Sequence, residues 1–120
     1  MKPAKAHIKS HSLWLVVPQN HNELKGGWRL LPHGSDGLLF DIAPFATGVP
    51  VWILITLAKE APPLDVLWIY QGEVSSIATM RGGCLQGYGD HVIEVKADWA
   101  VQHEVKIGDP VILEKTIRTH

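Results

Sequence analysis

The feature that most constrains this chain is a pair of apolar segments in its middle. The first, V-P-V-W-I-L-I-T-L at residues 49–57, is almost entirely apolar, and the second, L-D-V-L-W-I-Y at 64–70, carries a single carboxylate. The charged and structure-breaking residues A-K-E-A-P-P separate them. Apolar runs of this length with such boundaries are typical of buried strands. The sequence therefore predicts two strands that pair with each other and are covered by the remaining sheet.

The side chains of the first segment favour a strand over a helix. A helix needs about 20 apolar residues to span a bilayer, and this segment is much shorter. Val51, Ile53 and Ile55 are β-branched and Trp52 is aromatic, and such side chains suit a pleated surface. Because both faces of the segment are apolar, we expect both to be buried, with Trp52 and Trp68 removing roughly 150–250 Å² each from water.

Length and composition predict one all-β domain over residues 1–120. A chain of 120 residues and 13.3 kDa is long enough to form one core. Its 11 glycines and 8 prolines are scattered between short apolar runs, a spacing typical of sandwiches and barrels. We expect a compact β-sandwich or barrel-like sheet pair, mainly antiparallel, with about eight or nine strands and one or two short helices.

The balance of charges and the single cysteine narrow the class of protein. Eleven Lys and Arg face 12 Asp and Glu, for a net charge of −1, which offers no electrostatic footprint for nucleic acid or an anionic membrane. Cys84 cannot form an internal disulfide, and the basic N-terminus is not followed by a signal peptide or a transmembrane span. We therefore expect a soluble cytoplasmic protein without nucleic-acid or membrane partners.

Shorter apolar runs predict the other strands, at residues 12–17, 28–31, 37–42, 73–80, 91–96 and 111–114. Gln71-Gly72 is a tight-turn signal that joins 64–70 to 73–80 as a hairpin. Residues 91–96 alternate, so we expect one buried and one solvated face. Residues 1–11 have little to bury and predict a flexible arm or an edge strand, and 115–120 predict a polar tail.

The segments between strands carry two helix signals and one predicted loop. Asn20 followed by Glu23 is typical of a helix N-terminus, and Asp98 is predicted to cap a short helix at W-A-V-Q-H-E. From Arg81 to Asp90 the sequence R-G-G-C-L-Q-G-Y-G-D holds four glycines and predicts a long loop. Long loops in compact domains tend to carry function, so we expect a candidate site there.

Several short motifs occur in the order seen in a known family. They are G-L-L-F at 37–40, W-I-L-I-T-L at 52–57, P-L-D-V-L-W-I at 63–69, Q-G-E-V at 71–74, I-A-T-M at 77–80, Cys84, Tyr88, E-V-K-A-D-W-A at 94–100 and I-G-D-P-V at 107–111. With these motifs the chain resembles the family called domain of unknown function 192, a small bacterial and archaeal β domain, from residue 22 to residue 113. The resemblance implies a compact β fold and no particular activity.

This chain departs from the family pattern after Trp52. Relatives there usually carry Met-Lys-Asn-Thr followed directly by Pro-Leu-Asp, whereas Ile53-Leu54-Ile55-Thr56 stands here and Ala58–Pro62 resembles an insertion. If the Lys-Asn pair serves a ligand in relatives, this member lacks those donors. We then expect its function to have drifted.

The histidines do not assemble a metal site in the sequence. His7 and His11 are four residues apart, with His21 and Glu23 nearby, and on a helix the first two would share a face. That segment lacks a helical apolar pattern, and no closed set of four ligands is evident. We therefore predict solvated histidines, no metal and no cofactor.

Cys84 and Asp65 are the candidate reactive side chains. Cys84, with Arg81 and His91 close in the sequence, is either a nucleophilic thiolate or a small buried side chain, and burial is favoured because free cysteines are mostly buried. Asp65 is either an exposed strand start, which is favoured, or a pocket carboxylate held by its neighbours. The motifs of the common enzyme classes do not occur, and no spacing shows that two carboxylates meet.

The remaining signal is aromatic. Tryptophan and tyrosine rings at the mouth of a sheet-lined cleft can stack a planar or saccharide-like ligand, with a carboxylate to orient it. The candidate ligand-binding residues are Trp52, Thr56, Asp65, Cys84 and Tyr88. We therefore predict a non-catalytic binding module for a small molecule or a partner protein. Two alternatives stay open: an enzyme using Asp65 or Cys84 in a cleft, and a homo-oligomer with the strand at 49–57 in its interface.

Overall fold

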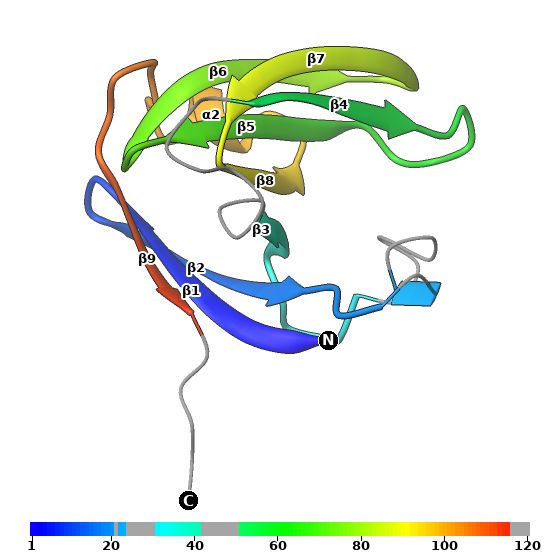
Figure 1. Cartoon of the computed structure of the whole chain (residues 1–120), viewed down its shortest axis with the longest axis horizontal. Helices are drawn as coiled ribbons and strands as arrows, with labels where there is room; N and C mark the ends of the chain where they lie inside the picture. Colours follow the sequence, from blue (N-terminus) through cyan, green and yellow to red (C-terminus); the bar gives the residue numbers. More distant parts are fainter. Residues whose placement is uncertain (21, 24–30, 42–50, 116–120) are drawn as a thin grey trace, which may run out of the picture.

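The computed structural model describes residues 1–20, 22–23, 31–41 and 51–115. Within these residues it contains nine strands and the short helix α2 (Figure 1). Their bounds are β1 (Lys2–Ile8), β2 (His11–Val17), β3 (Gly37–Asp41), β4 (Val51–Leu57), β5 (Leu64–Tyr70), β6 (Glu73–Met80), β7 (Gly83–Gly89), β8 (His91–Lys96), α2 (Trp99–Gln102) and β9 (Val111–Lys115). The prediction of a compact all-β fold is confirmed.

Seven of the strands form one strongly curled sheet in the order β6-β5-β8-β3-β2-β1-β9. Every neighbouring pair is antiparallel except β2 and β3, which run parallel. The two ends of this order meet where Glu73 bridges to Pro110 and the Val111 amide donates to the Gly72 carbonyl at 2.8 Å. The sheet therefore curls into a half-barrel, with β1, β2 and β9 at one end of the molecule and β5 and β6 at the other (Figure 1).

The inner face of this half-barrel encloses the larger of two hydrophobic cores. Ala4, Ala6 and Ile8 of β1 point into it, alternating with more exposed residues, because successive side chains of a strand lie on opposite faces. Leu67 comes from β5, and Ala100 comes from α2. The core thus joins strands from both ends of the chain.

β4 and β7 form a separate two-stranded sheet, which we call the ribbon. The ribbon packs on the outer face of the half-barrel, where Ile53 of β4 meets a second core of buried side chains from β5, β6 and β8. These side chains are Val66, Trp68, Met80 and Val92. β5 therefore has one core on each of its faces, and its residues from Leu64 to Ile69 are all buried.

Two glycines allow β7 to lie directly against β5. A Cβ atom at Gly87 would come within 2.4 Å of the Trp68 ring, and one at Gly89 would come within 2.4 Å of the Ile69 carbonyl oxygen. Only glycine permits approaches this close. The Trp68 indole also donates through Nε1 to the Ile53 carbonyl at 3.1 Å, which ties β5 to the other strand of the ribbon.

Several expectations about the centre of the chain are wrong, beginning with the burial of both faces of 49–57, because Trp52 is 64% exposed. β4 and β5 do not pair, because β4 pairs with β7 whereas β5 lies between β6 and β8. Residues 81–90 are not a long loop, because 83–89 form β7. The face of β8 predicted to be solvated is covered by the second core, so that residues 91–95 are all buried.

The N-terminal segment is also more ordered than its composition predicts. Residues 2–8 form β1, which is neither a flexible arm nor an edge strand, because it pairs with β2 on one side and with β9 on the other. Ala4, Ala6 and Ile8 alternate there with Lys5 and His7, and this weak signal is enough when β2 and β9 are both in place. Of the predicted polar tail at 115–120, Lys115 ends β9 and the rest lies outside the described residues.

The predicted turn at Gln71-Gly72 and the predicted cap at Asn20 are confirmed, whereas the predicted cap at Asp98 is wrong, because its side chain makes no cap hydrogen bond to α2. Gln71 and Gly72 both have positive φ, 50° and 77°, as a two-residue hairpin turn between β5 and β6 requires. The Glu23 amide donates to Asn20 Oδ1 at 2.9 Å, which is the expected N-terminal cap. The strand predicted at 28–31 is not observed at residue 31 and otherwise falls outside the described residues.

No helix in the described part of the chain is long and apolar enough to cross a membrane.

Candidate functional site

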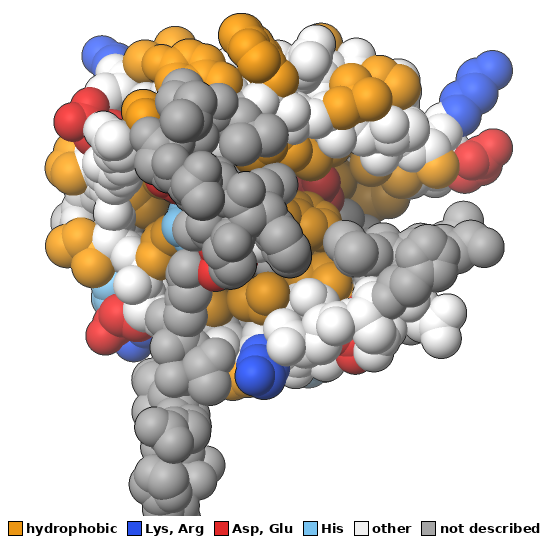
Figure 2. All heavy atoms as spheres, in the orientation of Figure 1, with side chains coloured by type: hydrophobic (Ala, Val, Ile, Leu, Met, Phe, Trp, Pro, Cys, Tyr) orange, Lys and Arg blue, Asp and Glu red, His pale blue; other side chains and the backbone are white. Residues whose placement is uncertain are grey.

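The side of the ribbon that faces away from the half-barrel is exposed. Its register pairs Trp52 with Tyr88, Leu54 with Gln86, and Thr56 with Cys84, and paired residues share a face of a sheet. All six side chains are exposed, including the large apolar side chains of Trp52 at 64% and Leu54 at 59%. We call this set the outer ribbon face. Figure 2 shows hydrophobic side chains gathered along that end of the molecule.

Aromatic rings continue from the outer ribbon face onto β5. The Trp52 and Tyr88 ring centroids lie 5.8 Å apart with 67° between the ring planes. The Tyr88 and Tyr70 centroids lie 5.7 Å apart at 64°. Both are edge contacts of the kind that aromatic pairs prefer. We call these three residues the aromatic row.

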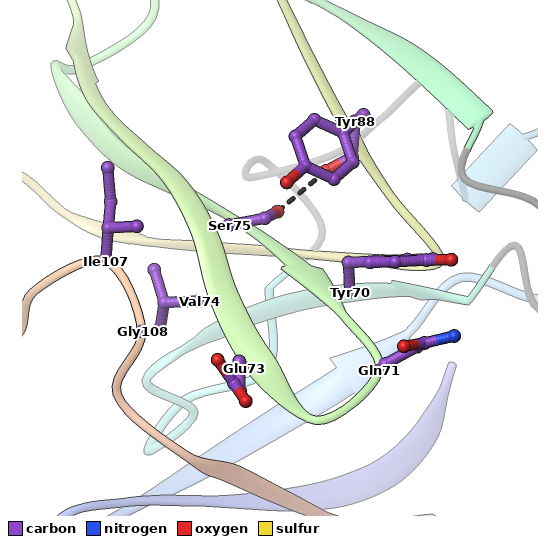
Figure 3. Close-up of a pocket in the computed structure, with 8 residues that line it drawn as sticks. All are labelled: Tyr70, Gln71, Glu73, Val74, Ser75, Tyr88, Ile107 and Gly108. Atoms are coloured by element: carbon purple, nitrogen blue, oxygen red, sulfur yellow. Dashed lines mark hydrogen bonds between the residues drawn. The ribbon is translucent and has the colours of Figure 1, made fainter.

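A pocket of about 230 Å³ lies at the Tyr70 end of the aromatic row. It is lined by side chains or backbone of Tyr70, Gln71, Glu73, Val74, Ser75, Tyr88, Ile107 and Gly108 (Figure 3). We call it the tyrosine pocket. Pockets for drug-sized ligands span about 300–1,000 Å³, so this one suits a small ligand or a single side chain.

Three local features of the β5–β6 hairpin shape the tyrosine pocket. Tyr70 and Glu73 are cross-strand partners that flank the turn, so their side chains share one face. The β5–β6 register shifts between Trp68 and Ile69, which leaves Ser75 as the extra residue of a β-bulge. The Ser75 hydroxyl lies 2.7 Å from the Tyr88 carbonyl oxygen and 3.0 Å from that of Trp68, so it links β6 to both β7 and β5.

Among the described residues, the lining of the tyrosine pocket has one charged side chain, the carboxylate of Glu73, and contains no Lys, Arg or His. Beside it, Asp90 accepts a hydrogen bond from the Gln71 amide at 3.1 Å. The pocket thus combines two phenol rings, an acidic group and the apolar side chain of Ile107. Such a surface offers hydrogen-bond acceptors and π-faces to a ligand.

Asp65 is not part of this site. Its side chain is buried, with 1% of the residue exposed, and it accepts hydrogen bonds from Thr79 Oγ1 at 2.7 Å and from the Ala100 amide at 2.9 Å. The favoured expectation of an exposed strand start is therefore wrong. Asp65 caps α2 from β5, whereas Asp98, which has a φ of 73°, makes no side-chain cap hydrogen bond.

Cys84 is exposed on the outer ribbon face, so the expectation of a buried thiol is wrong. Its Sγ lies 3.4 Å from Thr56 Oγ1. Among the described residues, no titratable side chain hydrogen-bonds to Cys84 or to Asp65. A nucleophile or general base needs such a neighbour, so the geometry offers no support for catalysis by either residue.

The histidines make contacts of their own. His7 hydrogen-bonds to Ser12 and to Glu114 across neighbouring strands. Buried His91 lies between two carboxylates, with Nδ1 2.7 Å from Asp90 Oδ1 and Nε2 3.1 Å from Asp41 Oδ1. The second contact lacks hydrogen-bond alignment, and it joins two cross-strand partners of β3 and β8. Among the described residues, no three His, Cys, Asp or Glu side chains are arranged to hold a metal ion.

Two carboxylates with shifted pKa values lie outside the tyrosine pocket. A hydrogen bond from the Gln19 amide is the main cause that lowers the pKa of Glu23. A hydrogen bond with His7 is the main cause that lowers the pKa of Glu114. Both groups are at the surface, where screening by water keeps such effects small.

The structure brings together four of the five candidate residues predicted from the sequence. Trp52, Thr56, Cys84 and Tyr88 share the outer ribbon face, and Asp65 lies apart from them. Glu73 and Ser75 line the pocket although neither was predicted as a site residue. The available signal was the Gln71-Gly72 turn, because a tight hairpin places the residues on either side of it next to each other.

Comparisons with known proteins add the fold and little more. No protein-family model matches the chain, and no curated protein matches it significantly. A solved structure described as a putative transcription regulator from Sinorhizobium meliloti 1021 has a TM-score of 0.68 and 20% identity, covering 95% of this chain and 92% of that one. A protein of unknown function from Novosphingobium aromaticivorans DSM 12444 has a TM-score of 0.66 and 20% identity, covering 92% and 83%. The chain therefore shares its fold with these two bacterial proteins, and the resemblance to domain of unknown function 192 stays a prediction.

Proposed function

We propose that this protein is a non-catalytic binding module that holds a small ligand in the tyrosine pocket. The observation that carries the proposal is the convergence of Tyr70, Glu73 and Tyr88 from three strands around one concave site. Sites for small molecules are concave, largely apolar and equipped with a few placed polar groups. The tyrosine pocket is concave and places a few polar groups beside its aromatic and aliphatic side chains, although polar atoms make up more of its lining than in a typical site.

The exposed part of the aromatic row supports the same proposal. Trp52 is 64% exposed beside the pocket, although burying its ring would stabilise the fold. An exposed aromatic cluster next to a concave site is typical of a binding surface. A ligand in the pocket could extend along this row.

A screen for ligands by thermal shift tests the proposal. A ligand present at 100 times its Kd stabilises the folded state by about 2.7 kcal/mol. We expect this stabilisation to be lost in Tyr88→Ala and kept in Trp14→Ala. Trp14 is the matched control, because it is an exposed aromatic residue (51%) on β2 that does not line the pocket. If Tyr88→Ala still binds the ligand, the tyrosine pocket is not the binding site.

A second candidate function is self-association through the ribbon. Leu54 and Trp52 place large apolar side chains on the outer ribbon face, and within the described residues β4 pairs only with β7, so its other edge is open. An open, apolar edge strand is a template for pairing with another chain, and a second copy would offer the same edge.

Mass measured by light scattering tests the second candidate. We expect a dimer for the native chain and a monomer for Leu54→Lys, which places a charge on the outer ribbon face. A monomeric native chain at high concentration would end this candidate and leave the ligand-binding proposal in place.

A further inference from the structure

We infer that the ligand of the tyrosine pocket is a small organic cation, an ammonium group that carries carbon substituents. This inference rests on the proposed function and adds the chemical class of the ligand. It is carried by the angle between the rings, the charge of the lining and the size of the pocket.

The ring geometry favours a rounded group over a flat one. Tyr70 and Tyr88 meet at 64°, and Tyr88 and Trp52 meet at 67°. A flat base or sugar stacks on one open ring face or on coplanar rings, whereas crossed rings form a corner. A substituted ammonium is compact and rounded, so it can touch both walls of a corner at once. Aromatic walls of this kind bind quaternary ammonium groups through cation–π attraction.

The charge of the lining favours a cation. Glu73 contributes a carboxylate, and the part of the lining that the structure describes contains no basic side chain that would repel a cation or attract an anion. Glu73 is the cross-strand partner of Tyr70, and both residues line the same pocket. Asp90, a second carboxylate beside the pocket, is already bonded to the Gln71 amide and to His91, so Glu73 is the acidic group of the lining that is left for a ligand. An anionic ligand would meet only repulsion from these groups.

The size and the apolar part of the pocket favour a small cation with carbon substituents. The volume of about 230 Å³ is below the range of about 300–1,000 Å³ for drug-sized ligands. Ile107, which is 68% exposed, gives the pocket an apolar wall. Methyl groups on the ammonium can contact this wall, and a bare metal ion or free ammonium cannot use it.

Choline and its neutral isostere 3,3-dimethylbutan-1-ol separate charge from shape. Binding is followed by amide chemical-shift changes in the full chain, read at Gly72, Ser75 and Tyr88. We expect choline to bind about tenfold more tightly than the isostere, because the neutral compound lacks the cation–π and charge terms. A trimethyllysine peptide run in parallel distinguishes a free small molecule from a protein side chain as the source of the ammonium.

Variants assign the effect to the named groups. Glu73→Gln should weaken choline binding about tenfold and leave the isostere unchanged, because only the charge is removed. Glu60→Gln is the matched control, since Glu60 is an exposed carboxylate between β4 and β5 that does not line the pocket. Tyr88→Leu should weaken choline binding several-fold while keeping an apolar side chain.

The outcomes separate this inference from the proposed function. If choline and the isostere bind equally, or if methyl glucoside binds more tightly than choline, the ligand is not a cation. The proposal of a small-ligand pocket is then unaffected. If none of these compounds shifts the amide signals at the pocket, the cation is overturned. If a wider metabolite screen is also silent, the proposed small-ligand pocket is overturned with it. If the trimethyllysine peptide binds and choline does not, the ligand is still a substituted ammonium. Its source is then a protein side chain and not a free small molecule.

Discussion

The strands β4 and β5 have nearly the same composition and very different surroundings. In β5 every residue from Leu64 to Ile69 is buried, including Trp68 at 1% exposure. In β4 burial alternates, with Ile53 at 8% and Trp52 at 64%. The apolar runs therefore predict both strands correctly. The prediction that both faces are covered is correct for β5 and wrong for β4.

The difference follows from the layers of the fold. β5 belongs to the half-barrel, so one face meets the inner core and the other meets the ribbon. β4 belongs to the ribbon, which is the outermost layer on that side (Figure 1). A contiguous exposed patch of large apolar side chains marks an interaction site or a tendency to aggregate. The contrast between the strands therefore directs attention to the outer ribbon face and to the tyrosine pocket at its end.

The largest expected difference in the free energy of unfolding is the one between the alanine variants of the two tryptophans, Trp68 in β5 and Trp52 in β4. Trp68→Ala should lower the free energy of unfolding by about 3–5 kcal/mol, because it opens a cavity between the ribbon and the half-barrel. Trp52→Ala should change it by less than about 0.5 kcal/mol. Urea unfolding of both variants measures the difference. Equal losses would mean that β4 and β5 are buried alike.

The contact between β7 and β5 should be the next most sensitive. Gly89→Ala places a Cβ 2.4 Å from the Ile69 carbonyl oxygen, and overpacking of this kind costs about 1–3 kcal/mol. Gln86→Ala, an exposed change on the same strand, is the control and should be nearly neutral. An unaffected Gly89→Ala variant would show that the ribbon is not held against the half-barrel there.

The polar side chains of the two strands should also differ. Asp65→Ala leaves the buried Ala100 amide without its acceptor, which should lower the free energy of unfolding by about 1–3 kcal/mol. Thr56→Ala on the exposed face of β4 should have little effect. Both are measured by denaturant unfolding, and a neutral Asp65→Ala would remove its role as the cap of α2.

Reactivity of the single thiol tests the exposure of the ribbon directly. Cys84 in the folded protein should be modified by iodoacetamide at neutral pH at a rate close to that of a small thiol, because it is exposed. Mass spectrometry follows the reaction, and urea-unfolded protein is the reference. Strong protection in the folded state, relieved on unfolding, would show that this face is covered.

The smallest expected effect is a pH dependence far from the ribbon. The hydrogen bond with His7 lowers the pKa of Glu114 below its usual value of 4.5, so its stabilisation is present above that value and is lost as the pH falls through the lower, folded pKa. Glu114→Gln should therefore show a slightly weaker loss of stability on acidification than the native chain. Thr56→Ala should follow the native pH profile, and the comparison is made by thermal unfolding between neutral and acidic pH.

Local signals in the sequence predicted the elements well. Two apolar runs around Gln71-Gly72 predicted the hairpin of β5 and β6, and the strand predicted at residues 91–96 has the same bounds as β8. The failures share a cause. β1 and β7 contain few large apolar residues. They form strands because neighbouring strands hydrogen-bond to them, as β2 and β9 do to β1. Pairing between distant segments leaves little trace in either segment alone.

The candidate site shows the same division. Trp52, Thr56, Cys84 and Tyr88 could be named from residue type, but the sequence does not say that Thr56 faces Cys84 or that Trp52 faces Tyr88. Glu73 became a site residue because the turn places it opposite Tyr70. Asp65 left the site because its strand is central and its carboxylate is needed at α2.

The sequence by itself determined that this chain forms short strands, where its tight turns lie and that a small all-β fold results. These properties depend on residues close together in the chain, through backbone conformation and the period of two along a strand. Only the tertiary structure decided that β5 is covered on both faces and β4 on one, and that the rings of Tyr70, Tyr88 and Trp52 adjoin a pocket. Burial depends on which layer a strand joins, and that is set by contacts between segments far apart in the sequence.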